Sequence, residues 1–290
     1  MTKVQATAIG FIAIGLWALL ALFTVGTAPV PPLQLNALCF AIGGSIGLVW
    51  LVLSGGLGQL KAIPLSVYAF GTAGLFGYHF IYFTALRLAP PAEASLIAYL
   101  WPLLIVVFSG LLPGEHLRKL HVLGAAIAFV GAAMIVLRGG QAGGIGGASA
   151  LPGYALAFLC ALIWSGYSLI SRRLGAVPTA AVVVYCLATA VLSLGAHLAM
   201  EETRWPTAPM GWFAVIGLGV GPVGIAFFTW DIGVKKGDIQ LLGTASYAAP
   251  LLSTLAMIAA GATAASPILV LAAALITAGA LVAAWASRPR

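Results

Sequence analysis

The chain has 290 residues, of which 62% are hydrophobic and only 7% are charged, and its formal net charge is +7. Soluble globular domains carry roughly 25% charged residues, so the composition excludes that class and indicates a polytopic membrane protein. The excess of basic residues would also suit a nucleic-acid-binding protein, but membrane topology explains their positions, as described below.

Apolar segments follow one another along the whole chain, and most have close to the roughly 20 residues that a helix needs to cross a bilayer. The apolar residues run continuously and do not alternate, which favours helices over a β-barrel. We therefore predict an all-α polytopic membrane protein with ten transmembrane helices, at 4–25, 33–53, 65–88, 92–112, 119–137, 152–171, 179–200, 208–234, 238–260 and 266–286.

The last five segments repeat the first five. The sequence Tyr-Leu-Trp-Pro at 99–102 returns as Tyr-Ala-Ala-Pro at 247–250, an offset of 148 residues that also carries Gly131 onto Gly279. Each half holds an odd number of segments, so the second half enters the membrane from the opposite face. We predict two inverted five-helix repeats, 1–138 and 151–290, around a central cavity and joined by a Gly-rich linker at 139–150.

The basic residues are distributed unevenly over this topology. With a cytoplasmic N-terminus, Arg87, Arg138 and Arg204 lie outside, and the other ten lie inside: Lys3, Lys61, Arg118, Lys119, Arg172, Arg173, Lys235, Lys236, Arg288 and Arg290. This is the positive-inside pattern. It predicts that both termini are cytoplasmic, and it accounts for the net charge with no nucleic-acid partner.

Aromatic residues fall into two groups by depth. Trp50, Trp205, Trp212 and Trp285 lie at segment ends, where interfacial aromatic residues are common. Mid-depth hydroxyl and indole groups need polar partners; a wet cavity supplies them, as does an aromatic core with internal hydrogen bonds, and we favour the cavity. The predicted substrate-binding residues are Trp17, Tyr78, His79, Tyr82, Tyr99, Trp101, Trp164 and Tyr167.

Three further features bear on mechanism. His79 is the only histidine deep in a segment, and we interpret it as a substrate contact, with a core role and a proton-coupling role as alternatives. Pro102 and Pro250 occupy equivalent repeat positions and are predicted hinges, tolerated kinks being the alternative. Asp231 stands four residues before Lys235, which predicts an ion pair that snorkels to the interface.

Motifs for chemistry are missing from the sequence. It has no P-loop, no HExxH and no pair of intramembrane carboxylates, and Cys39, Cys160 and Cys186 read as small buried apolar residues. We therefore predict that the protein is not an enzyme, is not powered by its own ATP hydrolysis, and uses no cofactor or metal.

A further set of motifs runs through the first half: Tyr-Phe-Thr-Ala-Leu-Arg at 82–87, Glu-Ala-Ser-Leu at 93–96, Tyr99, Pro102, Gly-Glu at 114–115 and the glycine-flanked helix 124–131. Together these motifs resemble the EamA type of the drug/metabolite transporter (DMT) superfamily. Thr263 departs from the pattern, since it stands where the second repeat would carry the mate of Glu115. Within the superfamily, Tyr-His at 78–79 and Tyr-Leu-Trp-Pro at 99–102 are most similar to those of aromatic amino-acid exporters.

This resemblance implies a secondary transporter in the lipid bilayer of the bacterial inner membrane. It would export small amphipathic solutes, in particular aromatic amino acids, by alternating access, and it would require no oligomer. The alternatives are an exporter of other metabolites or of cationic drugs such as paraquat, a channel, or an intramembrane enzyme. A planar apolar side chain with a zwitterionic head suits a cavity of aromatic walls and neutral donors, although aromatic faces also attract cations.

Overall fold

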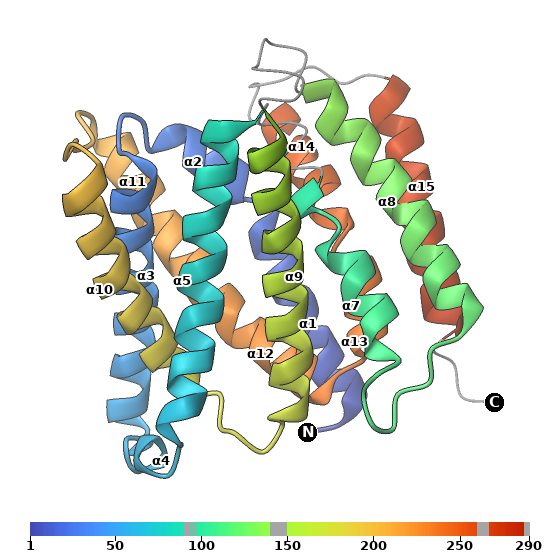
Figure 1. Ribbon diagram of the computed structural model, residues 1–290, viewed down its shortest axis with the longest axis horizontal. Helices are drawn as coiled ribbons and strands as arrows, with labels where there is room; N and C mark the ends of the chain where they lie inside the picture. Colours follow the sequence, from blue (N-terminus) through green and yellow to red (C-terminus); the bar gives the residue numbers. More distant parts are fainter. Residues whose placement is uncertain (90–93, 95–96, 140–149, 260–266, 287–290) are drawn as a thin grey trace.

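The computed structural model describes residues 1–89, 94, 97–139, 150–259 and 267–286, and the regular structure of these residues is entirely helical. The helices lie side by side in one bundle (Figure 1). They are α1 (Lys3–Trp17), α2 (Leu20–Gly26), α3 (Pro32–Leu53), α4 (Gly58–Lys61), α5 (Leu65–Leu88), α7 (Trp101–Ser109), α8 (Lys119–Gly139), α9 (Leu151–Arg173), α10 (Ala181–Met200), α11 (Pro209–Val220), the π-helix η2 (Gly221–Ile225), α12 (Ala226–Lys236), α13 (Ile239–Ala245), α14 (Ala248–Ala259) and α15 (Pro267–Ala286).

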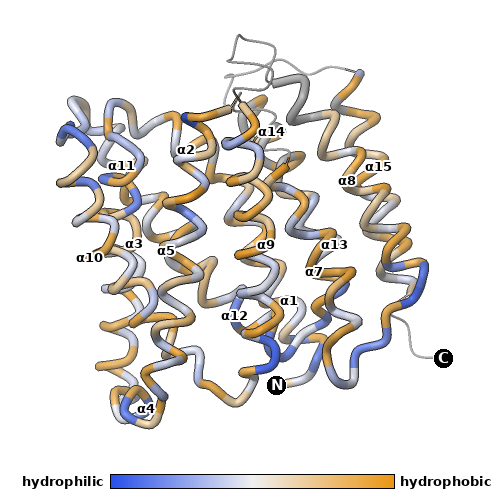
Figure 2. Tube along the Cα trace, in the orientation of Figure 1, coloured by the Kyte–Doolittle hydropathy of each residue, from blue (hydrophilic) through white to orange (hydrophobic). Residues whose placement is uncertain are grey.

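The helices have the length and hydropathy of membrane spans. Within the described residues, 5 helical stretches are long and apolar enough to cross a bilayer, namely Lys3–Gly26, Pro32–Leu53, Leu151–Arg173, Ala181–Met200 and Pro209–Lys236, and shorter apolar helices accompany them. Figure 2 shows apolar residues along the shafts and hydrophilic residues gathered towards the helix ends. The fold is that of an all-helical polytopic membrane protein. The predicted segments 33–53 and 65–88 agree with α3 and α5 to within one residue.

Several predicted helices are interrupted. The first breaks between α1 and α2, the eighth passes through η2, and the ninth breaks between α13 and α14. Pro222 lies in the first turn of η2, where its lack of an N–H group suits a change in the hydrogen-bond pattern. Hydropathy is continuous across these breaks, so the sequence pattern did not reveal them.

Helices from the first half of the chain pack in pairs with helices from the second half. The pairs are α8 with α15, α3 with α10, α5 with α9, α1 with α12, and α7 with α13. Glycines allow the closest approaches: a Cβ added to Gly124 in α8 would lie 2.6 Å from the carbonyl oxygen of Gly279 in α15. Only residues without side chains let the two backbones touch in this way. The three cysteines are buried and free, as predicted.

One end of the bundle carries the N-terminus (Figure 1), and we call it the basic end because Lys3, Arg172 and Lys235 form contacts there. Arg172 of α9 donates to the carbonyl oxygens of Val234, Lys235 and Gly237 at 3.2, 2.9 and 2.9 Å, and it forms an ion pair with Glu115. Lys3 pairs with Asp238 at 3.1 Å. The Arg172–Glu115 and Lys3–Asp238 pairs join the two halves of the sequence at this end.

The opposite end, which we call the Glu201 end, is organised around one carboxylate. Glu201 accepts from the backbone N–H of Leu33 at 3.0 Å and of Gln34 at 3.2 Å, at the start of α3. It also pairs with Arg87 at 2.8 Å and with His197 at 3.1 Å. A carboxylate at a helix N-terminus satisfies donors that have no partner within the helix, so Glu201 ties α3, α5 and α10 together.

The Asp231–Lys235 pair forms as predicted, but the prediction that it snorkels is wrong, because the pair is buried inside the protein. The two groups lie 2.8 Å apart, and their side chains are only 1% and 3% exposed. The ammonium of Lys235 also donates to the carbonyl oxygen of Val177 at 3.0 Å, and Thr179 donates to the carboxylate at 2.8 Å. The loop between α9 and α10 therefore encloses the pair, and snorkelling is unnecessary because both charges find partners inside the protein.

Candidate functional site: an aromatic cluster at the centre of the bundle

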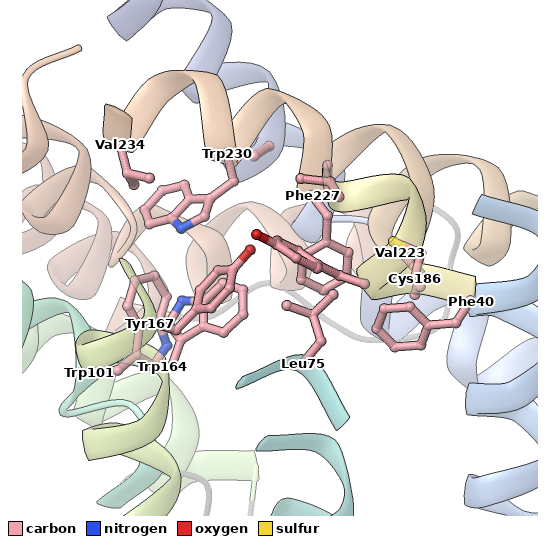
Figure 3. Packing of buried hydrophobic residues seen from close by; sticks show 14 of the residues in the cluster. Phe40, Leu75, Trp101, Trp164, Tyr167, Cys186, Val223, Phe227, Trp230 and Val234 are labelled. Carbon is pink, nitrogen blue, oxygen red and sulfur yellow. The ribbon is translucent and has the colours of Figure 1, made fainter. Parts of the chain in front are cut away.

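Trp164 of α9 is the centre of a cluster of aromatic side chains. Its ring centroid lies 5.9 Å from that of Trp17 at the end of α1, and 6.2 Å from that of Trp101 at the start of α7. Tyr167, one turn further along α9, stacks on Trp164 at 5.3 Å. Figure 3 shows Trp101, Trp164 and Tyr167 gathered opposite Trp230 of α12. Four of the predicted site residues thus meet in one place.

A second group of predicted residues extends from this cluster along α5. Tyr78 lies 5.4 Å from Trp164, and it stacks on Tyr82 at 5.9 Å with nearly parallel rings. His79 packs edge-on against Tyr78 at 5.2 Å, and its Nδ1 lies 2.8 Å from the carbonyl oxygen of Leu75. The i,i+4 spacing that suggested a shared helix face for Tyr78 and Tyr82 is confirmed.

Tyr99 occupies the turn immediately before α7. It stands two residues before Trp101, the first residue of that helix. Seven of the eight predicted residues therefore form one aromatic region connected by ring contacts, built from α1, α5, α7 and α9, and Tyr99 lies in the turn that leads into α7.

The region is graded in exposure. Trp101, Trp164 and Tyr167 are buried, whereas Trp17, Tyr78, His79, Tyr82 and Tyr99 are half-buried. Half-buried hydroxyl and imidazole groups at this depth can meet a solute, and the buried rings behind them supply a rigid wall. The residues of the region include no carboxylate, ammonium or guanidinium group.

Two indole N–H groups have fixed partners. Trp17 donates to the carbonyl oxygen of Pro222, in the π-helix η2, at 3.1 Å. Trp230 donates to the hydroxyl of Ser168 on α9, also at 3.1 Å. Each bond links the first or sixth predicted segment to the eighth, so the cluster includes hydrogen bonds that hold particular ring orientations.

Sequence reasoning missed three members of the cluster. Trp230 lies 5.1 Å from Trp17, Phe227 lies 5.7 Å from Trp164, and Phe40 packs on His79 at 5.1 Å. The repeat offset of 148 residues could have found two of them, because it carries His79 onto Phe227 and Tyr82 onto Trp230. Phe40 has no such signal.

The two predicted hinge prolines both stand in first turns of helices. Pro102 is the second residue of α7 and Pro250 the third of α14. Each proline follows a break in the helix at the tyrosine three residues before it. In a first turn the N–H that proline lacks would have no helical partner. The interruption therefore precedes the proline in both copies, and whether it moves stays a prediction.

Comparison with known proteins gives a consistent result. The model of the EamA-like transporter family matches twice, at residues 5–137 and 151–285. The chain is 54% identical over 290 residues to the aromatic amino acid exporter YddG of Ancylobacter novellus, covering 99% of this chain and 100% of that protein. It is 26% identical to YddG of Salmonella typhimurium, covering 88% of each. A solved crystal structure with 51% sequence identity matches over 100% of both chains with a TM-score of 0.94.

Proposed function

The chain belongs to the EamA-like transporter family, and from that premise we propose that it exports aromatic amino acids across the bacterial inner membrane by alternating access. The observation that carries the proposal is the aromatic region around Trp164, where both halves of the chain contribute rings at mid-depth. The relatives named as aromatic amino acid exporters support the same substrate class.

The chemistry of the region suits a zwitterion with an aromatic side chain. Ring faces and edges at 5–6 Å spacing are the geometry in which aromatic groups pack favourably. The hydroxyls of Tyr78, Tyr82 and Tyr99 supply neutral hydrogen-bonding groups for the polar head. The carboxylate of Asp231 is engaged with Lys235 and Thr179, so it is a weaker candidate for attracting a cationic drug.

Two inverted five-helix repeats account for the pairing of helices. Exchanging the halves converts the first segment into the sixth and the third into the eighth, so the α1–α12 pair becomes the α9–α5 pair. The pairs α3–α10 and α8–α15 each map onto themselves. A pseudo-two-fold axis in the membrane plane predicts this pattern, and the two family matches divide the chain near the proposed linker.

The basic end would face the cytoplasm, following the positive-inside rule. Arg172 and Asp238 make their contacts at that end, and we assign this arrangement to a state closed towards the cytoplasm. A solute leaving the cell would enter when these contacts open and leave towards the Glu201 end. Cysteine placed at Lys119 should react with a membrane-impermeant maleimide only in inside-out vesicles, and cysteine at Glu202 only in intact cells; the reverse pattern would overturn the orientation.

Counterflow into proteoliposomes tests the function. Vesicles loaded with unlabelled phenylalanine should accumulate labelled phenylalanine, tyrosine and tryptophan without ATP, and alanine, lysine and paraquat should compete weakly. Preferential counterflow of paraquat or of aliphatic amino acids would contradict the proposed substrate. Chemical conversion of the solute would indicate an enzyme, and flux that does not saturate would indicate a channel.

A further inference from the structure

The repeated Tyr-x-x-Pro motif has a different role in each half of this structure. Its first copy runs from Tyr99 to Pro102 and leads into α7, which begins at Trp101. Its second copy runs from Tyr247 to Pro250 and leads into α14, which begins at Ala248. The two tyrosines are repeat mates, yet Tyr247 is fully buried and Tyr99 is half-buried. The site described above uses only Tyr99.

Tyr247 caps a helix that belongs to the other half. Its hydroxyl accepts a hydrogen bond from the backbone N–H of Leu103, 144 residues away, at 3.0 Å. Leu103 lies in the first turn of α7, where backbone N–H groups have no helical partner. Pro102 offers no N–H, and Leu104 already donates to the carbonyl oxygen of Leu100 at 3.0 Å. The tyrosine hydroxyl therefore satisfies the first-turn donor that follows Pro102.

The equivalent bond from the first copy is missing among the described residues. The repeat offset carries Leu103 onto Leu251, so the mate of the observed bond would join the Tyr99 hydroxyl to the N–H of Leu251. Tyr99 is instead half-buried in the turn before α7. One conformation of the protein thus contains one occupied and one vacated version of the same contact.

We propose that Tyr247 and Tyr99 are alternating helix caps: Tyr247 caps α7 when the basic end is closed, and Tyr99 caps α14 when it is open. This inference rests on the proposed alternating access, in which the two halves exchange conformations. The Lys3–Asp238 ion pair at the basic end and the Tyr247 cap occur together in this structure, and we assign them to the same closed state. Exchange of the halves opens the basic end, releases the Tyr247 hydroxyl from Leu103 and brings the Tyr99 hydroxyl to Leu251.

The exchange connects access to the aromatic region. Trp101 is the first residue of α7, and it contacts Trp17 and Trp164 while Tyr247 holds that helix start in place. Loss of the cap frees the first turn of α7 and thus the Trp101 ring. In the same transition the Tyr99 hydroxyl moves to Leu251, so the polar side of the region changes together with its apolar wall.

The experiment measures opening of the basic end without any substrate. In a background with Cys39, Cys160 and Cys186 replaced by alanine, Ile239→Cys serves as reporter, because Ile239 is fully buried next to Asp238 at that end. Maleimide labelling in nanodiscs reports the open fraction. Tyr247→Phe keeps the ring that packs against Phe129 and removes only the cap, so labelling should become about tenfold faster.

Tyr99→Phe removes the cap of the opposite state, and labelling should become about tenfold slower. The double variant should return near the parent rate. Tyr185→Phe removes a buried hydroxyl from α10, away from both caps, and should leave labelling unchanged. If the melting temperature shows that Tyr247→Phe does not fold, the labelling rate of Tyr99→Phe alone tests the proposal.

Shifts in the same direction for both tyrosines, or no shift in Tyr99→Phe, would overturn the alternating caps. The labelling experiment uses no solute, so its result does not depend on whether the proposed function is correct. Wild-type counterflow of phenylalanine without opposite labelling shifts refutes the caps alone. Opposite shifts without counterflow refute the substrate assignment alone.

Discussion

The tryptophans around Trp164 and those at the helix ends have the same side chain in two different environments. Trp230 is 1% exposed, and its indole N–H is bonded to Ser168, whereas Trp285 is 69% exposed on α15. Trp205 and Trp212 stack on each other at 5.7 Å with both rings still exposed. Central rings are held by neighbours on several helices, and peripheral rings lie where lipid headgroups would surround them.

The comparison teaches that position in the bundle, and not residue type, separates buried central aromatic residues from exposed peripheral ones. A central ring contributes to packing, to hydrogen bonding and to the shape of the site at once. A peripheral ring contributes to the interface with lipid and can be replaced at little expense to the interior. Substitutions in the two groups should therefore differ in size and in kind.

Replacing the central ring of Trp164 should have the largest effect. Trp164→Ala removes contacts with Trp17, Tyr78 and Trp101 and leaves a cavity, which costs about 3–5 kcal/mol of unfolding free energy in a well-packed core. The melting temperature of the purified protein in detergent should fall accordingly. A melting temperature equal to that of Trp285→Ala would show that the central cluster is not packed as described.

Breaking one hydrogen bond within the cluster should have a smaller effect. Trp230→Phe keeps a ring on α12 but leaves the Ser168 hydroxyl without its donor, and it also removes part of the packing volume, so we expect a loss of about 1–3 kcal/mol. Ser168→Ala removes the other partner and is the matched control. The double variant should lose less than the sum of the two, as a double-mutant cycle in thermal unfolding will measure.

Trp17→Phe should separate the effect of ring packing from the effect of the indole hydrogen bond. The aromatic contacts with Trp164 and Trp230 are largely kept, but the bond to the Pro222 carbonyl in η2 is lost. We expect a change of about 1 kcal/mol in stability and a weaker apparent affinity for phenylalanine in counterflow. Unchanged affinity and stability together would mean that η2 is not positioned by Trp17.

Substitutions of the exposed pair Trp205 and Trp212 should have the smallest effect. Trp205→Leu and Trp212→Leu alter side chains that stack at the surface, and surface changes usually stay within about 0.5 kcal/mol. Counterflow per reconstituted protein should match wild type. A large loss of flux in either variant would remove the distinction between central and peripheral rings.

Much of the fold could be predicted because long apolar runs specify helices directly. The ranges of α3, α5, α9 and α15 follow from hydropathy and from prolines and glycines at the ends. The breaks at Ala18, in η2 and at Ser246 could not be predicted, because each lies inside a continuous apolar run. They depend on contacts between helices, such as Trp17 with Pro222, which a single sequence does not display.

The predicted site residues were chosen by depth, and seven of the eight lie in mutual ring contact, while their binding of a solute stays a prediction. Phe40 joins them through the packing of α3, and no sequence pattern marks it. Asp231 was placed at the interface because charge next to lipid is unfavourable. The loop carrying Val177 and Thr179 removes that penalty, and it does so from a different part of the sequence.

The most direct test compares Trp164→Leu with Trp285→Leu in proteoliposomes at equal protein content, measuring the initial rate of phenylalanine counterflow below saturation. Loss of a central aromatic contact corresponds to about 2 kcal/mol, or roughly a 30-fold lower rate, for Trp164→Leu. Trp285→Leu should transport at the wild-type rate. Equal rates in the two variants would contradict a substrate site at the central aromatic cluster.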